Sequence, residues 1–134
     1  MHLVWTTRER RVLIDAPMAR FLCRLLRALA RKEQCHVLEI GMVRTHIHLL
    51  IRLHPTTSVS LLAKRLKGAS STIAGQQGLG ASGRLLWSKG YGARTVSVQT
   101  LPTVRRYLRA QPTHHPTEAI EGWPGEDPEY DGSE

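Results

Sequence analysis

The sequence has few cysteines, no long apolar run and, over most of its length, few acidic residues. Cys23 and Cys35 have neither CxxC spacing nor partners of zinc-finger type, which excludes a zinc finger and predicts two reduced, buried thiols. No stretch of about eighteen apolar residues exists, and the first residues lack the apolar core of a signal peptide. We therefore expect a soluble, cytoplasmic protein that does not associate with membranes.

Acidic residues are scarce in the body of the chain and concentrated at its end. Residues 1–111 hold all 19 Lys and Arg residues and only four acidic residues, a net of +15, whereas residues 112–134 hold seven acidic residues and no Lys or Arg, a net of −7. Residues 1–111 are so basic that we expect them to bind phosphate groups, which makes nucleic acid the leading partner. Residues 112–134 are also rich in Pro and Gly, so we expect a largely irregular acidic tail that either aids solubility or folds back on the basic body.

The pattern of apolar residues predicts one domain that mixes helices and strands. At 134 residues the chain is long enough for one core and too short for two. In chain order we expect a strand at 2–6, a helix that follows Asp15 and runs to about 32, strands at 34–42 and 45–53, a helix capped by Ser58 or Ser60, extended segments at 85–87 and 93–98, and a helix within 100–111. This order predicts an α+β sandwich in which helices cover a mainly antiparallel sheet.

His46 and His48 stand two residues apart in the apolar run THIHLLIRL, residues 45–53. In a strand they share one face with Leu50 and Arg52, whereas the opposite face is wholly apolar and suits a core. Two imidazoles on one face can bind a divalent metal, and Arg52 beside them can bind an anion. Such a pair also arises by chance in a chain with seven histidines. The remaining histidines have no partner at ligand spacing and are expected to be structural or solvated: His2, His36, His54, His114 and His115.

Two enzyme classes that use paired histidines fit the pattern less well. A histidine-triad hydrolase needs a third histidine where Leu50 stands, and a two-histidine phosphoesterase needs a repeated His-x-Thr or His-x-Ser, which the sequence lacks. Tyr107 and Gln111 favour a different class of enzyme. They lie four residues apart, so on one helix a phenol and an amide oxygen would approach the same point. Taken alone, Tyr107 beside an apolar helix stripe also fits a packing role.

Together these residue types suit chemistry on a phosphodiester. His46, His48 and Gln111 would bind Mg²⁺ or Mn²⁺ through two neutral imidazoles and an amide oxygen, leaving the double charge of the cation to act on a phosphate. The Tyr107 phenolate would be favoured by the metal and by three nearby guanidinium groups, and its attack on DNA would give a covalent phosphotyrosine and a free hydroxyl. Those guanidinium groups belong to Arg105, Arg106 and Arg109.

Five blocks in this order resemble the HUH single-tyrosine transposases, the small insertion-sequence enzymes that include the REP-associated tyrosine transposases. The resemblance covers almost all of residues 4–111. Its blocks are LVWTTRERRVL (3–13), HIHLLI (46–51), LLAKRLKGASS (61–71), LWSKGYGARTVS (86–97) and RRYLRAQ (105–111). In the last block, tyrosine and glutamine stand at the spacing that the family uses for its nucleophile and its third metal ligand.

The resemblance implies a ferredoxin-like HUH catalytic domain at residues 1–111. Such a domain works as a homodimer and uses a 5′-phosphotyrosine to cleave and rejoin single-stranded DNA at hairpin-forming element ends. In that family the tyrosine helix can complete the active site of the partner subunit. By the same analogy, residues that contact DNA, besides Arg52 and the three arginines around the tyrosine, are Lys64, Lys67, Ser70, Arg84 and Trp87.

Two positions depart from the family pattern. The family usually has Asp or Asn before the first histidine of the pair, where this chain has Thr45, so the residue that orients His46 lacks a negative charge. Pro112 follows Gln111 directly, and a residue before proline avoids helical geometry. These departures leave open a second reading, in which the chain is a domesticated, catalytically inactive regulator that binds nucleic acid on the same fold.

Overall fold

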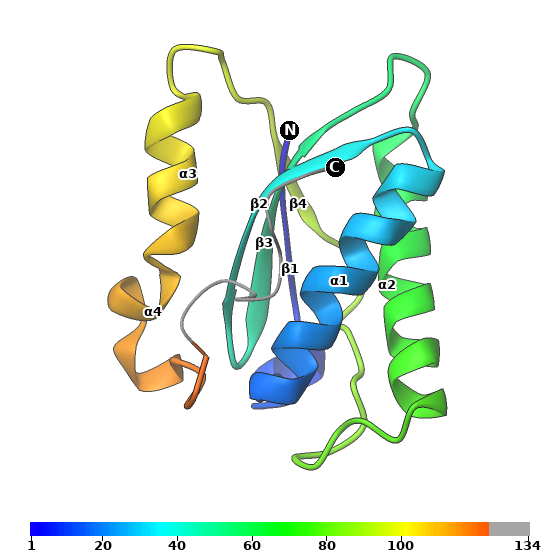
Figure 1. Ribbon diagram of the computed structural model, residues 1–134, viewed down its shortest axis with the longest axis vertical. Helices are drawn as coiled ribbons and strands as arrows, with labels where there is room; N and C mark the ends of the chain where they lie inside the picture. The colour runs from blue at the N-terminus through cyan, green and yellow to red at the C-terminus, as the bar shows by residue number, and fades with distance from the viewer. Residues whose placement is uncertain (124–134) are drawn as a thin grey trace.

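A four-stranded antiparallel sheet forms the centre of the protein, and helices cover both of its faces (Figure 1). The computed structural model describes residues 1–123. The strands lie in the order β2-β3-β1-β4, and neighbouring strands are antiparallel. The main elements are β1 (His2–Thr6), α1 (Ala16–Lys32), β2 (His36–Val43), β3 (His46–Arg52), α2 (Val59–Gln76), β4 (Gly92–Arg94), α3 (Leu101–Arg109) and α4 (Gln111–His114). This β-α-β-β-α-β order is ferredoxin-like, as predicted.

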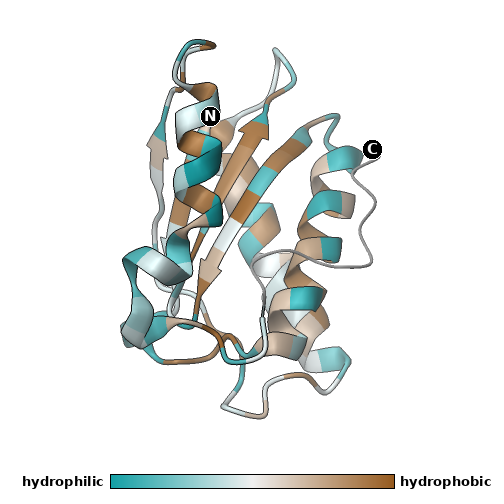
Figure 2. Ribbon diagram, turned by 60° about the vertical axis from the view of Figure 1, so that its left-hand side comes forward, coloured by the Kyte–Doolittle hydropathy of each residue, from teal (hydrophilic) through white to brown (hydrophobic). Residues whose placement is uncertain are grey.

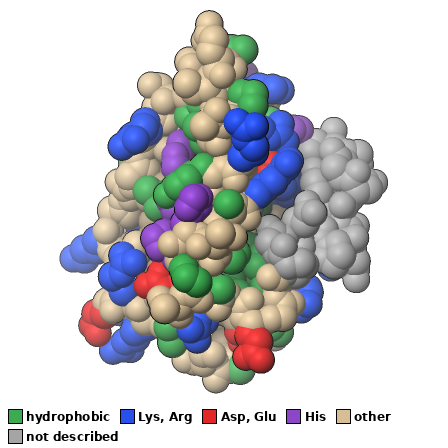
Figure 3. Space-filling view, turned by 90° about the vertical axis from the view of Figure 1, so that its left-hand side faces the viewer, with side chains coloured by type: hydrophobic (Ala, Val, Ile, Leu, Met, Phe, Trp, Pro, Cys, Tyr) green, Lys and Arg blue, Asp and Glu red, His purple; other side chains and the backbone are tan. Residues whose placement is uncertain are grey.

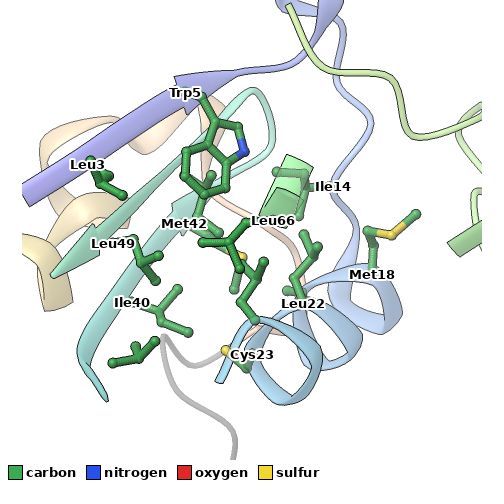
Figure 4. Packing of buried hydrophobic residues seen from close by; sticks show 14 of the residues in the cluster. Leu3, Trp5, Ile14, Met18, Leu22, Cys23, Ile40, Met42, Leu49 and Leu66 are labelled. Atoms are coloured by element: carbon green, nitrogen blue, oxygen red, sulfur yellow. The ribbon is translucent and has the colours of Figure 1, made fainter. Parts of the chain in front are cut away.

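The sheet has an apolar face and a polar face, because side chains alternate along each strand. In β3, Ile47, Leu49 and Ile51 are fully buried in the core that the sheet forms with α1 and α2. Figure 4 shows Leu49 in this core. His46 and His48 lie on the opposite face, which α3 and α4 cover (Figure 1). The predicted faces of this strand are confirmed, and the histidines lie between the sheet and the last two helices.

Helices α1 and α2 begin where the sequence places their caps. The Asp15 carboxylate accepts a hydrogen bond from the Met18 amide at 3.0 Å, and the Ser58 hydroxyl accepts one from the Leu61 amide at 3.3 Å. Each such cap stabilises its helix by about 1 kcal/mol. Both helices carry apolar residues toward the sheet and polar residues outward, so the ribbon changes between brown and teal along each of them (Figure 2). No helix within residues 1–123 has both the length and the apolar character needed to cross a membrane.

The segments predicted as extended after α2 contribute little to the sheet. Of residues 93–98 only Ala93 and Arg94 belong to the three-residue edge strand β4, and residues 85–87 supply a single bridge between Trp87 and Thr7. Farther along the chain, the Ser97 hydroxyl accepts a hydrogen bond of 3.2 Å from the Thr100 amide in the turn that precedes α3. A short edge strand of this kind offers little template for pairing with another chain.

The fold continues beyond residue 111, where the sequence predicted the domain to end. Residues 111–114 form α4, residues 116–118 form a 3-10 turn, and Ile120 and Trp123 are buried in the core cluster. The first part of the expected irregular tail therefore packs on the domain. Burial of the Ile120 and Trp123 side chains favours this packing and offsets part of the entropy lost when the segment is ordered. The rest of the predicted tail, residues 124–134, lies outside the described residues.

Candidate active site

The polar face of the sheet gathers histidines beneath α3 and α4. In β3, His46 pairs with Thr6 of β1 and Val43 of β2, and the rings of His46 and His48 lie 5.2 Å apart. The face of the molecule that carries α3 and α4 shows histidine side chains near its centre, with Lys and Arg side chains around them (Figure 3). The strand register thus brings both imidazoles of the predicted pair to one point.

His48 is held as a neutral imidazole. Burial is the main cause, and three neighbouring imidazoles add to it, so that the pKa of His48 falls from 6.5 to about 3. Its Nδ1 lies 2.8 Å from His2 Nε2. A neutral ring keeps a nitrogen lone pair available to a metal at neutral pH. Sequence reasoning gave His2 no role, because only the pairing of β1 with β3 brings it to His48.

His46 is also buried, with 6% of its surface exposed. Burial lowers its pKa, while Gln111 and Glu118 act in the opposite direction. Its Nδ1 lies 3.1 Å from the Thr45 hydroxyl, and that hydroxyl donates a hydrogen bond of 3.0 Å to Glu118. The His115 ring stands 5.1 Å from the His46 ring. The predicted tail therefore reaches the histidine pair, although its two histidines were expected to be solvated.

Gln111 is the third residue of the predicted metal set, and its side chain has no hydrogen-bonding partner in the described part of the chain. It is fully buried, and neither amide atom bonds to a residue within 1–123. The amide lies near enough to His46 to raise the pKa of that imidazole, but no hydrogen bond of normal length and angle joins the two. No three His, Cys, Asp or Glu side chains of residues 1–123 could hold a metal ion. Two imidazoles and an amide oxygen are a set of donors that could hold a divalent cation.

Tyr107 and Gln111 do not share one continuous helix, which corrects the prediction for residues 100–111. Helix α3 ends at Arg109, and α4 begins at Gln111 after a break at Ala110. Pro112 is the physical reason, since its ring clashes with the carbonyl four residues earlier and it has no amide to donate. Both side chains still lie on the histidine side of the sheet, because α3 and α4 cover the same face (Figure 1).

Tyr107 stands beside the histidine pair and remains accessible. Its ring lies 6.0 Å from the His48 ring and 4.8 Å from the His114 ring, and 41% of the residue is exposed. A cavity of about 630 Å³ opens next to it, between β4 and α3. The cavity lining includes His2, His48, Arg94, Val104 and Tyr107. The Tyr107 phenol and the His48 imidazole therefore border the same cavity.

The stretch of chain that forms this site matches a known family. A family model described as "Transposase IS200 like" matches residues 1–111. The chain belongs to the IS200-like transposase family. This confirms the predicted kinship with the HUH single-tyrosine transposases.

Relatives of this IS200-like transposase include proteins with curated names. It is 28% identical over 114 residues to the ISDra2 transposase TnpA of Deinococcus radiodurans, an alignment that covers 82% of this chain and 81% of the relative. It is 29% identical over 114 residues to the transposase for insertion sequence element IS200 of Salmonella typhimurium, with 82% and 74% covered.

Solved structures share the fold of this IS200-like transposase. A crystal structure of a protein of Deinococcus radiodurans R1, described as a transposase, has a TM-score of 0.62 and 26% identity and covers 82% of this chain and 88% of that one. A REP-associated tyrosine transposase bound to a REP hairpin has a TM-score of 0.65 at 13% identity, covering 85% and 66%, which shows likeness of fold.

Among the predicted DNA-contacting residues of this transposase, two lie in the interior. Trp87 is 8% exposed and packs edge-on against Trp5, and its Nε1 donates a hydrogen bond of 2.9 Å to Ser70. Ser70 is fully buried and donates in turn to the Lys67 carbonyl. The structure therefore gives Ser70 and Trp87 a packing role instead of contact with DNA. Lys67 donates to the Ser88 and Gly90 carbonyls, so its ammonium group holds that loop in place.

The other basic residues predicted to contact DNA lie at the surface, but two of them, on α3, form ion pairs with a glutamate. Arg52, Lys64, Arg84 and Arg106 are exposed. The Glu39 carboxylate pairs with Arg105 Nε at 3.2 Å and Arg109 Nε at 3.0 Å. Because Glu39 compensates part of their charge, these two guanidinium groups attract phosphate less than the sequence suggested.

Proposed function

We propose that this IS200-like transposase cleaves and rejoins single-stranded DNA through a covalent bond between Tyr107 and a 5′ phosphate, with Mg²⁺ or Mn²⁺ bound by His46, His48 and Gln111. The observation that carries the proposal is the buried amide of Gln111, which has no hydrogen-bond partner within residues 1–123 and lies beside His46. An unsatisfied buried amide costs about 1–3 kcal/mol. A cation at this point would give the amide oxygen its partner.

The residues of the chain have distinct parts in the reaction. A bound cation would polarise the phosphodiester as a Lewis acid. His46 and His48, kept neutral by burial, would ligate it without adding charge. Tyr107 attacks the phosphorus, so the bond from its oxygen to phosphorus forms and the bond to the preceding O3′ breaks. The phenol proton passes to solvent, and the departing oxygen leaves as a 3′ hydroxyl after taking up a proton.

The phosphotyrosine intermediate also accounts for the rejoining of DNA strands. The phosphotyrosine keeps the energy of the broken phosphodiester, so the 3′ hydroxyl of another strand can attack it and release Tyr107 without a nucleotide cofactor. The REP-associated relative is bound to a DNA hairpin. We propose hairpin-forming single-stranded element ends as the substrate and a homodimer as the working assembly. Within one chain, Tyr107 already lies 6.0 Å from His48, ring to ring, which favours a site built from a single subunit.

A trapping experiment tests the proposal. The protein is incubated with Mg²⁺ or Mn²⁺ and single-stranded DNA from the ends of its own element, and the products are separated in SDS. We expect a protein–DNA adduct that disappears with Tyr107→Phe or a chelator and persists with Tyr91→Phe, a matched control because Tyr91 is 39% exposed and Tyr107 41%. An adduct formed by Tyr107→Phe would refute this nucleophile. Binding of DNA with no adduct and no metal dependence would support the regulator instead.

A further inference from the structure

The segment after α4 is fixed on the turn between β2 and β3. The Arg44 amide donates a hydrogen bond of 2.8 Å to the Glu118 carbonyl, and Arg44 Nη2 donates one of 2.7 Å to the Thr117 carbonyl. These two bonds place the Glu118 side chain above Thr45. One carboxylate oxygen then accepts from the Thr45 hydroxyl at 3.0 Å and lies 3.7 Å from His46 Nδ1.

The hydrogen bonds around Thr45 determine where the proton of His46 resides. A carboxylate only accepts hydrogen bonds, so the single hydroxyl proton of Thr45 is donated to Glu118. The Thr45 oxygen can then only accept from His46 Nδ1, 3.1 Å away. His46 therefore carries its proton on Nδ1 and has its lone pair on Nε2. That is the tautomer in which Nε2 can bind a metal.

We propose that Glu118 is a positioning residue that orients His46 for metal binding through the Thr45 hydroxyl. The purpose of this orientation rests on the proposed function, but the tautomer itself does not. A carboxylate that fixes a ligand histidine raises metal affinity by about 10- to 100-fold. Here the carboxylate comes from 73 residues after Thr45 and lies beyond residue 111, where the family match ends.

Glu118 supplies the negative charge that Thr45 lacks at the position before His46. The family that the chain resembles usually places Asp or Asn immediately before the first histidine, and this chain has Thr45. The hydroxyl of Thr45 cannot supply a negative charge, but it transmits the charge of Glu118 by hydrogen bonding. Arg10 lies 3.7 Å from the other oxygen of the Glu118 carboxylate and helps to hold it.

The tautomer can be read directly in the metal-free protein. Two-bond ¹⁵N correlation spectra distinguish an imidazole protonated on Nδ1 from one protonated on Nε2. We expect His46 to be protonated on Nδ1 in the wild type, and to become a mixture or switch in Glu118→Ala and in Thr45→Val. Thr45→Ser keeps the hydroxyl and should keep the wild-type tautomer. Glu121→Ala, which removes an exposed carboxylate of the same segment, is the matched control.

Mn²⁺ titration supplies the second measurement. Glu118→Ala and Thr45→Val should weaken Mn²⁺ binding about 10- to 100-fold, whereas Glu121→Ala should not. Adding Thr45→Asp to Glu118→Ala should restore affinity, because the charge then stands directly before His46. An unchanged His46 tautomer in both Glu118→Ala and Thr45→Val would overturn the inference. Should the wild type bind no Mn²⁺, the proposed function fails, while the tautomer still decides the role of Glu118. Thr45→Val preserves shape and serves if Glu118→Ala does not fold.

Discussion

Gly41 lies where the last two helices press on the sheet, and its replacement by Ala tests how tightly that packing holds the active site. Gly41 belongs to β2 and pairs with His48 of β3. A Cβ at this position would lie 2.3 Å from the Leu108 oxygen and 3.0 Å from Gln111 Cγ. Because real Cβ atoms stay at least 3.0 Å from other heavy atoms, the end of α3 would have to move outward by about 0.7 Å or more.

The expected loss of activity is larger than the loss of stability. Overpacking at a site of this kind costs about 1–3 kcal/mol, which leaves most domains folded. The displaced atoms belong to Leu108, next to the proposed nucleophile Tyr107, and to Gln111, the proposed ligand. A misplacement of about 1 Å can cost about 100-fold in rate. We therefore expect Gly41→Ala to fold, with adduct formation and Mn²⁺ affinity each reduced by about 10- to 100-fold.

The assay compares Gly41→Ala with Gly68→Ala. Gly68 lies inside α2, and a Cβ there meets no atom within 4 Å. Ala in a helix interior is more favourable than Gly by up to about 1 kcal/mol, so this control should gain stability and keep full activity. Circular dichroism and urea denaturation report folding, and single-turnover trapping reports the rate. A folded Gly41→Ala protein with wild-type adduct formation and Mn²⁺ affinity would refute the argument that close packing at Gly41 positions the catalytic groups.

Two further predictions concern charge. Burial lowers the pKa of His48 to about 3, below its ordinary 6.5, so between pH 7 and pH 5 the unfolded chain takes up a proton that the folded chain does not. Stability should be full well above pH 6.5 and fall by about 2 kcal/mol by pH 5, as urea denaturation would show; a constant free energy of unfolding would contradict burial of a neutral ring. Glu39→Gln removes the carboxylate charge beside Arg105 and Arg109, so it should tighten binding of single-stranded DNA severalfold at low salt and steepen its salt dependence by about one unit of slope. Fluorescence anisotropy at several salt concentrations measures both, and an unchanged slope would count against that role of Glu39.

Local patterns in the sequence predicted the scaffold and the face of the sheet on which the histidine pair lies. Alternation along residues 45–53 placed the histidines opposite the core, since the burial of strand residues follows a period of two. The helix caps at Asp15 and Ser58 were likewise readable, because a cap bonds within three residues. Pro112 pointed to the end of the tyrosine helix, although not to a second helix beginning at Gln111.

Other features could not be read from the sequence, because they depend on contacts between distant segments. His2 reaches His48 only through the register of β1 on β3, and Glu118 reaches Thr45 only through the path of the chain after α4. Trp87 was assigned to DNA contact by analogy, with a role in the core as the alternative, and its indole bonds to a buried serine on α2. Composition also misled for residues 112–123, where Ile120 and Trp123 pack into the core although the stretch is rich in Pro and polar residues.

The position of Glu118 has a practical consequence for anyone who shortens this protein. A truncation at residue 111, where similarity to the family stops, would look like a clean removal of a charged appendage. It would in fact delete the carboxylate above Thr45 together with the two apolar anchors Ile120 and Trp123. Preparations intended for crystallisation or metal titration should therefore extend at least to Trp123.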